Sequence, residues 1–377
     1  MRSKGRLVAL AGVLLALLAV VISAHVVPTS QGRTRPPVPA RPTSPTSPTS
    51  PISRLAGHPV RFADSHSIYW GASIKTPQGQ APWNMNIADQ FGRLTGKNVS
   101  IISWGSLFYS PQYCTGWCNF QTTQFDAVRG YGAIPMLSWG PNWSRSIDAK
   151  VANGDYDSYL ITWAKAAKAW GHPFFLRFAW EMNGDWFPWG VGRTGVSTEG
   201  NTPATYVAMW RHVYNLFHQV GANNVTWVWC PNVNADTTYE PLSSLYPGNA
   251  YVNWTGLDGY NRDNPWRSFP AIYAASYADV GSFAPTKPMV IGEVASTEAG
   301  GSKANWIQNM FETLPSLFPN IRGLLWYQDD QPGPRGRGDW TVNTSPSALS
   351  AFKAGLSSPL YQSNAYSSAD TSPIPPP

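Results

Sequence analysis

The chain of 377 residues carries a net charge of +6, and 14% of its residues are aromatic. The first 57 residues hold seven basic residues and no acidic one, which leaves 20 basic against 21 acidic residues in the remainder. A nucleic-acid-binding domain needs a surplus of positive charge on its folded surface, so the near neutrality of the larger part excludes nucleic acid as a partner.

The amino-terminal residues predict export. Three basic residues among the first six precede an apolar run over residues 7–22, and the small residues Ser23 and Ala24 follow. This is the pattern of a signal peptide, with cleavage after Ala24. The run also approaches the length of a membrane-spanning helix, so residues 7–24 as an uncleaved membrane anchor stay open as the alternative. In both cases we expect a secreted or extracellular protein, free or tethered to the cell membrane.

The composition changes at two further points of the chain. Residues 25–57 are rich in Pro, Thr and Ser, as in the repeat over residues 41–51, which has no apolar residue to bury. Such a segment is typical of a semi-extended linker. Residues 361–377 are also rich in Pro and predict a disordered tail, which leaves residues 58–360 for a single folded domain.

Within that domain, short apolar runs alternate with longer amphipathic segments. Eight runs have the length and composition of strands, and they cover residues 67–74, 98–103, 133–139, 173–180, 224–230, 252–260, 288–293 and 321–327. Helical patterns cover residues 156–170, 203–220 and 304–317, the second with Thr202 as its cap and Gly221 as its end. Eight strands that alternate with helices predict the α/β class and a (β/α)8 TIM barrel. An open doubly wound sheet is the rival, but no Gly-rich phosphate loop follows the first strand.

The ends of the predicted strands carry polar and aromatic residues. Active sites of such barrels are built at the carboxyl ends of the strands. The strand-end candidates are Trp104, Trp139, Glu181, Asn232, Tyr260, Glu293 and Trp326. All 19 Trp follow residue 69, and aromatic rings of this kind stack on the apolar faces of sugars.

Glu181 and Glu293 end the fourth and seventh predicted strands. An isolated carboxylate at the end of a buried run is too costly unless it is solvated, paired or functional. Cleavage of a glycosidic bond needs two carboxyl groups, and a retaining enzyme holds them about 5 to 5.5 Å apart. Because strands four and seven face each other across an eight-stranded barrel, the two glutamates predict a glycosidase with Glu181 as acid/base and Glu293 as nucleophile.

Three segments resemble glycoside hydrolase family 26, which is best known for β-mannanases. They are RFAWEMNGDWFPWG at residues 177–190, LYPGNAYVNWTGLDGYN at residues 245–261 and MVIGE at residues 289–293. The resemblance implies Glu181 as acid/base, Glu293 as nucleophile and Tyr260 as a hydrogen-bond donor to that nucleophile. It also implies Trp326 as the floor beneath the sugar, with Trp186 and Trp189 lining the cleft.

Two residues near Glu181 are expected to act through their neighbours. Arg177 lies four residues before Glu181 and therefore on the same side of the strand, which favours a supporting role over direct contact with substrate. Trp180 stands where mannanases of this family usually have His. That departure bears on the sugar that is recognised and leaves the reaction unchanged.

The three cysteines predict one local disulfide, between Cys114 and Cys118, and leave the state of Cys230 open. The six histidines show no metal-ligand spacing, so we expect no catalytic metal and no other cofactor. We also expect a monomer whose partner is its polysaccharide substrate.

The leading hypothesis is therefore a retaining, endo-acting β-1,4-mannanase that cleaves extracellular mannan-type polysaccharide by double displacement. A β-1,3-1,4-glucanase or a xylanase on the same scaffold is the alternative. A hypothesis of another class is a non-catalytic carbohydrate-binding barrel, which has no need of two facing carboxylates.

Overall fold

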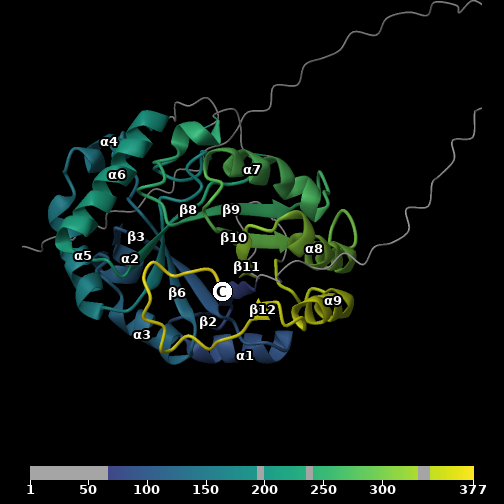
Figure 1. The fold of residues 1–377 in the computed structure, drawn as a ribbon. Helices are drawn as coiled ribbons and strands as arrows, with labels where there is room; N and C mark the ends of the chain where they lie inside the picture. Colours follow the sequence, from purple (N-terminus) through teal and green to yellow (C-terminus); the bar gives the residue numbers. More distant parts are fainter. Residues whose placement is uncertain (1–66, 193–198, 235–240, 330–339) are drawn as a thin grey trace, which may run out of the picture. The chain divides into compact units, whose positions relative to one another are not determined.

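The computed structural model describes residues 67–192, 199–234, 241–329 and 340–377, without the side chains of residues 112 and 113. Eight parallel strands form a closed barrel, because β1 (Ile68–Thr76) pairs with β3 (Ile101–Leu107) on one side and with β11 (Ile321–Gln328) on the other. The remaining barrel strands are β6 (Ile134–Gly140), β7 (Phe174–Phe178), β8 (Val225–Trp229), β9 (Trp254–Asn261) and β10 (Met289–Ser296). Each overlaps one of the eight predicted runs, which confirms the (β/α)8 barrel (Figure 1).

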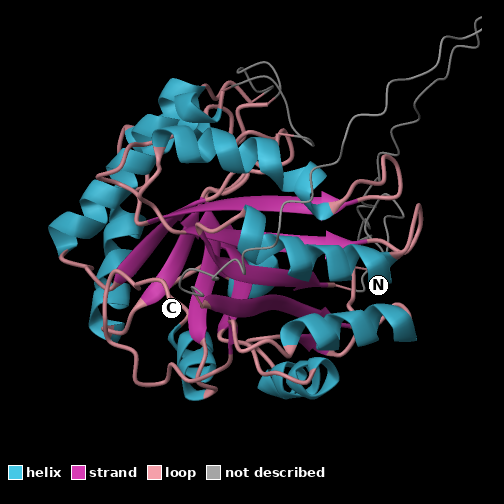
Figure 2. Ribbon diagram, turned by 45° about the vertical axis from the view of Figure 1, so that its right-hand side comes forward, coloured by secondary structure: helices cyan, strands magenta, loops and turns pink. Residues whose placement is uncertain are grey.

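Helices surround the barrel, as Figure 2 shows. They are α1 (Met85–Thr95), α2 (Pro111–Cys114), α3 (Thr122–Gly130), α4 (Ile147–Ala152), α5 (Asp157–Trp170), α6 (Pro203–Val220), α7 (Phe269–Phe283), α8 (Lys303–Leu317), α9 (Pro346–Leu356) and the 3-10 helix η1 (Leu242–Leu245). Short strands are β2 (Gly79–Gln80), β4 (Tyr109–Ser110), β5 (Gly116–Trp117) and β12 (Tyr361–Gln362).

Helix α6 shows how local sequence sets its ends. The Thr202 hydroxyl accepts a hydrogen bond from the Thr205 backbone, and the Thr205 hydroxyl lies 2.9 Å from the Thr202 nitrogen, so both caps of the first turn are made. Pro203 occupies the first turn, where no hydrogen-bond donor is needed. Gly221 ends the helix with φ of 79°, a left-handed conformation that glycine adopts without strain. The predicted bounds of this helix are confirmed.

The alternation of side chains along each strand divides the core into two layers. Inside the barrel, Tyr69, Phe175 and Trp254 pack near its amino-terminal end, with ring centroids 5.3 to 6.4 Å apart. Outside the barrel, aromatic rings fill the space beneath the helices, as where Trp139 stacks on Trp163 of α5 at 4.5 Å. The carboxyl ends of the strands are left for polar groups.

The carboxyl-terminal residues contradict the predicted disorder. Tyr361 pairs with Ile68 in β1, and the chain then crosses the amino-terminal end of the barrel, where it is the yellow segment of Figure 1. Its backbone accepts hydrogen bonds from Trp254 and from Tyr69, and Ile374 is 4% exposed. Proline-rich chain is ordered here because contacts with distant strands replace the regular hydrogen bonds that proline cannot make.

The disulfide between Cys114 and Cys118 is formed, and Cys230 is a buried free thiol. In the part of the chain that the structure describes, no helix has the length and apolar character needed to cross a membrane. The predicted leader and linker, residues 1–57, lie outside the described residues.

Candidate active site

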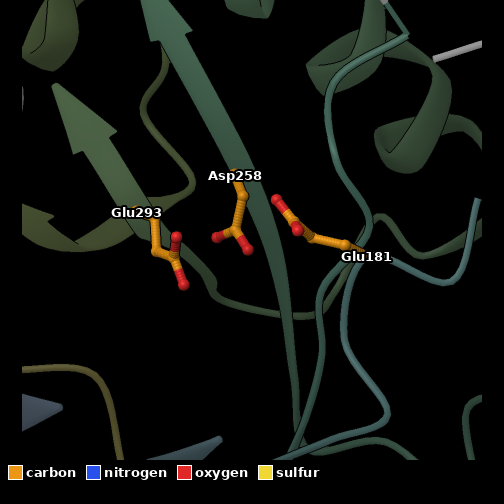
Figure 3. A group of neighbouring side chains, drawn as sticks. All are labelled: Glu181, Asp258 and Glu293. Carbon is orange, nitrogen blue, oxygen red and sulfur yellow. The ribbon is translucent and has the colours of Figure 1, made fainter. Parts of the chain in front are cut away.

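Three carboxyl groups meet at the carboxyl-terminal end of the barrel. Glu181 follows β7, Asp258 lies in β9 and Glu293 lies in β10. One oxygen of each carboxyl group lies within 4.8 Å of the others, and Figure 3 shows the three side chains pointing toward one another. The fold therefore brings together the two predicted glutamates, which are separated by 112 positions in the sequence.

The backbone around Glu181 is held in a costly conformation. Ala179 and Glu181 have φ of 40° and 51°, in the left-handed region that residues with a Cβ seldom adopt. The Glu181 nitrogen donates to the carbonyl oxygen of Cys230 at 2.8 Å, and the Ala179 nitrogen donates to that of Trp139 at 2.8 Å. Bonds to the strands on both sides therefore hold a bend that turns Glu181 into the barrel mouth. Such strain is characteristic of functional sites.

Two side chains donate hydrogen bonds to the Glu181 carboxyl group. The indole nitrogen of Trp186 lies 2.6 Å from Oε2, and the amide nitrogen of Asn232 lies 2.5 Å from Oε1. Asn232 is itself fixed by Asn183, whose side-chain amide makes bonds of 2.8 and 2.9 Å with the Asn232 backbone. The orientation of the carboxyl group is therefore set before a substrate arrives.

Burial is the largest cause that raises the pKa of Glu181, and the negative charge of Glu293 adds to it. Hydrogen bonds from Asn232 and Trp186 and the positive charge of Arg177 lower it in part. The resulting pKa is about 7. Glu181 therefore keeps a proton up to neutral pH, as a general acid must.

Glu293 is paired with a cation and is less buried than Glu181. Arg177 and Tyr260 each donate to one of its carboxyl oxygens, and its side chain retains 16% exposure. The strand pairing slips between Ile291 and Glu293, a bulge that re-aims the strand end toward the barrel mouth. Arg177 and Tyr260 therefore fix the orientation of the Glu293 carboxyl group at the barrel mouth.

Arg177 is the centre of a buried network. Its Nε donates to Ser138 at 2.8 Å, and its guanidinium also donates to Asp258 at 2.5 Å. The Cys230 thiol donates to the other oxygen of Asp258 at 3.2 Å. Burial raises the pKa of Asp258, and the guanidinium of Arg177 opposes that shift. Asp258 and Ser138 thus hold Arg177 in place, and Arg177 holds Glu293.

A cluster of three carboxyl groups also raises the question of a metal ion. Here the guanidinium of Arg177 already lies against Asp258 and Glu293, and donors from Tyr260, Asn232 and Trp186 take up carboxyl oxygens that a metal would need. A metal would have to displace these donors. These hydrogen-bond donors suit carboxyl groups that act as acid and base better than carboxylates that ligate a metal.

Three predicted sugar-binding tryptophans are placed elsewhere, and those predictions are wrong. Trp139 and Trp326 point outward from their strands, against Trp163 of α5 and Phe352 of α9, and are 0% and 1% exposed. Trp189 is 0% exposed and donates to the carbonyl oxygen of Trp180. In the two strands the cause is the period of two, which turns every second side chain away from the barrel axis.

The other predicted residues lie near the site. Trp186 is 38% exposed beside Glu181, and Tyr260 contacts Glu293. The Trp180 ring covers the Arg177 guanidinium at 5.3 Å. Trp104 packs on Phe125 of α3 and is 3% exposed, so only its edge reaches the neighbouring cavity.

Three residues of the site were not among those predicted from the sequence. Asp258 lies two positions before Tyr260, so the period of the strand places both on one face and would have indicated it. Tyr327 and Trp340 lie beside Tyr260, with ring centroids 5.8 and 5.1 Å away. For Trp340, which follows the last barrel strand in a loop, local sequence contains no such signal.

Comparison with known proteins agrees with this geometry. Residues 140–311 match the profile of the family described as Glycosyl hydrolase family 26. Endoglucanase H of Acetivibrio thermocellus is 37% identical over 285 residues, which are 71% of this chain and 29% of that protein. A mannan endo-1,4-beta-mannosidase of Bacillus subtilis is 31% identical over 183 residues, 46% of each chain.

Among solved structures, a Cellulomonas fimi endo-beta-1,4-mannanase double mutant matches with a TM-score of 0.61 at 18% identity, over 79% of this chain and 72% of that chain. This likeness shows the fold. The chain spans less than a third of the length of Endoglucanase H. The rest of Endoglucanase H lies outside the aligned residues. By its sequence profile and its relatives, the chain belongs to glycosyl hydrolase family 26.

Proposed function

We propose that the protein is a retaining β-glycoside hydrolase that cleaves an extracellular polysaccharide. One observation carries the proposal: a carboxyl group with a pKa of about 7, Glu181, lies within 4.8 Å of the hydrogen-bonded carboxylate of Glu293. Inverting enzymes need about 6.5 to 9.5 Å between the two carboxyl groups, to leave room for water. The shorter separation supports direct attack by a carboxylate.

The reaction then runs in two displacements. Glu293 attacks the anomeric carbon and forms a glycosyl ester while Glu181 gives its proton to the leaving oxygen. Once that proton has left, Glu181 accepts a proton from a water molecule, which attacks the same carbon and releases Glu293. Arg177 and Tyr260 hold the Glu293 carboxylate, and Asn232 and Trp186 hold Glu181, so both groups are oriented before the substrate binds.

For the polymer, β-glucan is the first candidate. The relative named Endoglucanase H is similar over 71% of this chain, whereas the mannosidase of Bacillus subtilis is similar over 46%. Trp180, in place of the usual His beside the acid/base, weakens the case for mannan. Mannan is the second candidate, which the mannosidase relative supports.

The test is an analysis of products from mannan, glucomannan, lichenan and xylan. We expect oligosaccharides from lichenan, and proton NMR of the first products should show the β-anomer, which then mutarotates. First products in the α-configuration would contradict retention. If no polymer is cleaved but one is bound, the hypothesis of a non-catalytic binding barrel replaces the proposal.

We also propose that the protein works outside the cytoplasm. The predicted leader supports this location, and so does the disulfide between Cys114 and Cys118, because disulfides persist in oxidising compartments. Detection of the protein in a culture medium or on the cell surface would test it, and recovery in the cytoplasm alone would contradict it.

A further inference from the structure

A cavity lies beside the candidate catalytic pair. Its volume is about 460 Å³, within the range of small-molecule sites. It opens between the carboxyl ends of β1 and β3, and its walls come from three segments of the chain, within residues 73–83, 104–121 and 180–187. Trp180, directly before Glu181, belongs to one wall, so the cavity adjoins the site where the bond is cleaved.

The lining has the chemistry that a neutral sugar requires. Trp83, Trp180 and Phe187 offer ring faces or edges, while Gln80, Gln121 and serine hydroxyls offer hydrogen bonds. Lys75 is the one charged residue of the lining, and it already pairs with Asp329 at 3.4 Å. A uronic acid or another anion would therefore find no free cation among these lining residues.

The outer wall is the loop closed by the disulfide. Cys114 and Cys118 both line the cavity, together with Ser110 of the hairpin formed by β4 and β5. A hydrogen bond of 2.6 Å from the Tyr109 nitrogen to the Asn142 side chain fixes the hairpin to the loop after β6. The disulfide holds this short loop at the cavity mouth.

Exposed aromatic rings continue outward from the same region. Among the described residues, the large apolar side chains that are clearly exposed are Trp83, Tyr109, Trp117, Trp143, Trp186 and Leu317. The five aromatic ones all lie in the connections that follow β1, β3, β6 or β7, Tyr109 and Trp117 in the hairpin of β4 and β5, on the face that holds Glu181. Leu317 lies at the far end of α8. Such one-sided exposure marks an interaction surface.

We propose that this cavity is a binding subsite for a neutral sugar unit of the substrate, with the Cys114–Cys118 loop as its outer wall. The inference rests on the proposed function, since it makes the cavity one part of the substrate cleft. The exposed rings of Trp83 and of the hairpin would contact the same polysaccharide chain. Substrate binding would therefore depend on the disulfide, although the catalytic pair lies outside the loop.

Gly105 allows a direct test, because a Cβ at this lining residue would have no atom within 4 Å. Gly105→Phe should therefore place its ring in the cavity, with no strain at the Cβ atom. Gly130→Phe is the matched control, since a Cβ at Gly130 also meets nothing and this residue ends α3, away from the cavity. Both changes are placed in the full chain carrying Glu293→Gln, so that bound oligosaccharides stay intact.

The measurement is the Kd, by titration calorimetry, of cello- and manno-oligosaccharides of increasing length. In the Glu293→Gln background we expect tighter binding as the chain grows long enough to reach the cavity. Gly105→Phe and Trp83→Ala should each raise the Kd of the longest oligosaccharides by about tenfold. The Kd of the shortest oligosaccharides should stay nearly unchanged. Replacement of both Cys114 and Cys118 by Ser should act in the same direction, while Gly130→Phe and Leu317→Ala should not.

If Gly105→Phe and Trp83→Ala bind the longest oligosaccharides as tightly as the background, the subsite is wrong. Thermal unfolding of each variant shows that it is folded, and Trp83 is exposed, so its replacement leaves the core intact. Failure of the proposed function gives another result: the unsubstituted protein then releases no sugar from any polymer, whatever the binding series shows.

Discussion

Arg177 and Glu293 form an ion pair at the mouth of the barrel, with the arginine side chain 2% exposed and the glutamate side chain 16% exposed. The cation is therefore fixed inside the protein while the carboxylate faces the solvent, where a substrate enters. Because Ser138 and Asp258 hold the guanidinium from the other sides, no reorganisation is needed when charge develops in the reaction.

The roles of the two glutamates can be separated by azide rescue. With an aryl glycoside, Glu181→Ala should accumulate the glycosyl ester, and azide, which needs no general base, should restore turnover and give the β-glycosyl azide. Glu293→Ala should give the α-glycosyl azide, because azide enters the space beneath the sugar. Each variant should lose about 10³-fold or more in rate without azide. The opposite pairing of anomers and variants would exchange the two roles.

The pH profile should report the environment of Glu181. Because this group must be protonated to act as the acid, kcat/KM should fall as the pH rises through its pKa of about 7. Trp186→Phe keeps an aromatic side chain but removes the indole N–H, whose hydrogen bond lowers this pKa. The alkaline limb of the profile should therefore move to higher pH. Trp143→Phe, an exposed tryptophan elsewhere on this face, is the control. An unchanged limb in Trp186→Phe would show that the hydrogen bond does not tune the acid.

Gly292 should be needed for the ion-pair network. A Cβ there would lie 2.7 Å from Oδ1 of Asp258 and 2.8 Å from the Arg177 guanidinium. Gly292→Ala should therefore displace Arg177 and lower kcat, by about tenfold or more, with little change in overall fold. Gly281→Ala in α7, where a Cβ meets no atom within 4 Å, should keep full activity. Equal kcat in the two variants would contradict the role of the network.

The carboxyl-terminal segment should stabilise the barrel. Ile374 is 4% exposed, and its carbonyl oxygen accepts from the Trp254 indole at 2.9 Å. Ile374→Ala should lower the free energy of unfolding by about 2 to 4 kcal/mol in urea titrations. Thr371→Ala, at an exposed position, should change it by less than about 0.5 kcal/mol. A neutral result for Ile374→Ala would mean that the segment detaches in solution.

Asp148 should make stability depend on pH. It is fully buried, neither of its carboxyl oxygens has a hydrogen-bond partner among the described residues, and burial raises its pKa well above the ordinary value. Since the folded protein holds this proton more tightly than the unfolded chain, stability should decrease as pH rises above the ordinary pKa of aspartate. Asp148→Asn should therefore raise the Tm at pH 7 and have little effect near pH 3. Asp370→Asn, at an exposed position, should leave the Tm unchanged at both pH values. A lower Tm for Asp148→Asn at pH 7 would contradict the prediction and would point to a partner that Asp148 binds as an anion.

Local sequence patterns were sufficient to predict the barrel and its two central glutamates. The period of two and the apolar runs placed the strands, and Thr202, Pro203 and Gly221 placed the ends of α6, because each of these signals acts through neighbours in the chain. Glu181 and Glu293 were found because a carboxylate at the end of a buried strand is costly and needs a reason. The pairing of Cys114 with Cys118 was equally local.

Only the tertiary structure decided which aromatic rings face the cleft and which face the helices. Trp139, Trp189 and Trp326 are buried while Trp83 and Trp143 are exposed, although tryptophan is suited to both surroundings and sequence composition does not distinguish them. The ordered carboxyl-terminal residues and the bond from Arg177 to Asp258 likewise depend on contacts between segments far apart in the chain. Such contacts follow from barrel closure, which brings strands side by side irrespective of the number of residues between them.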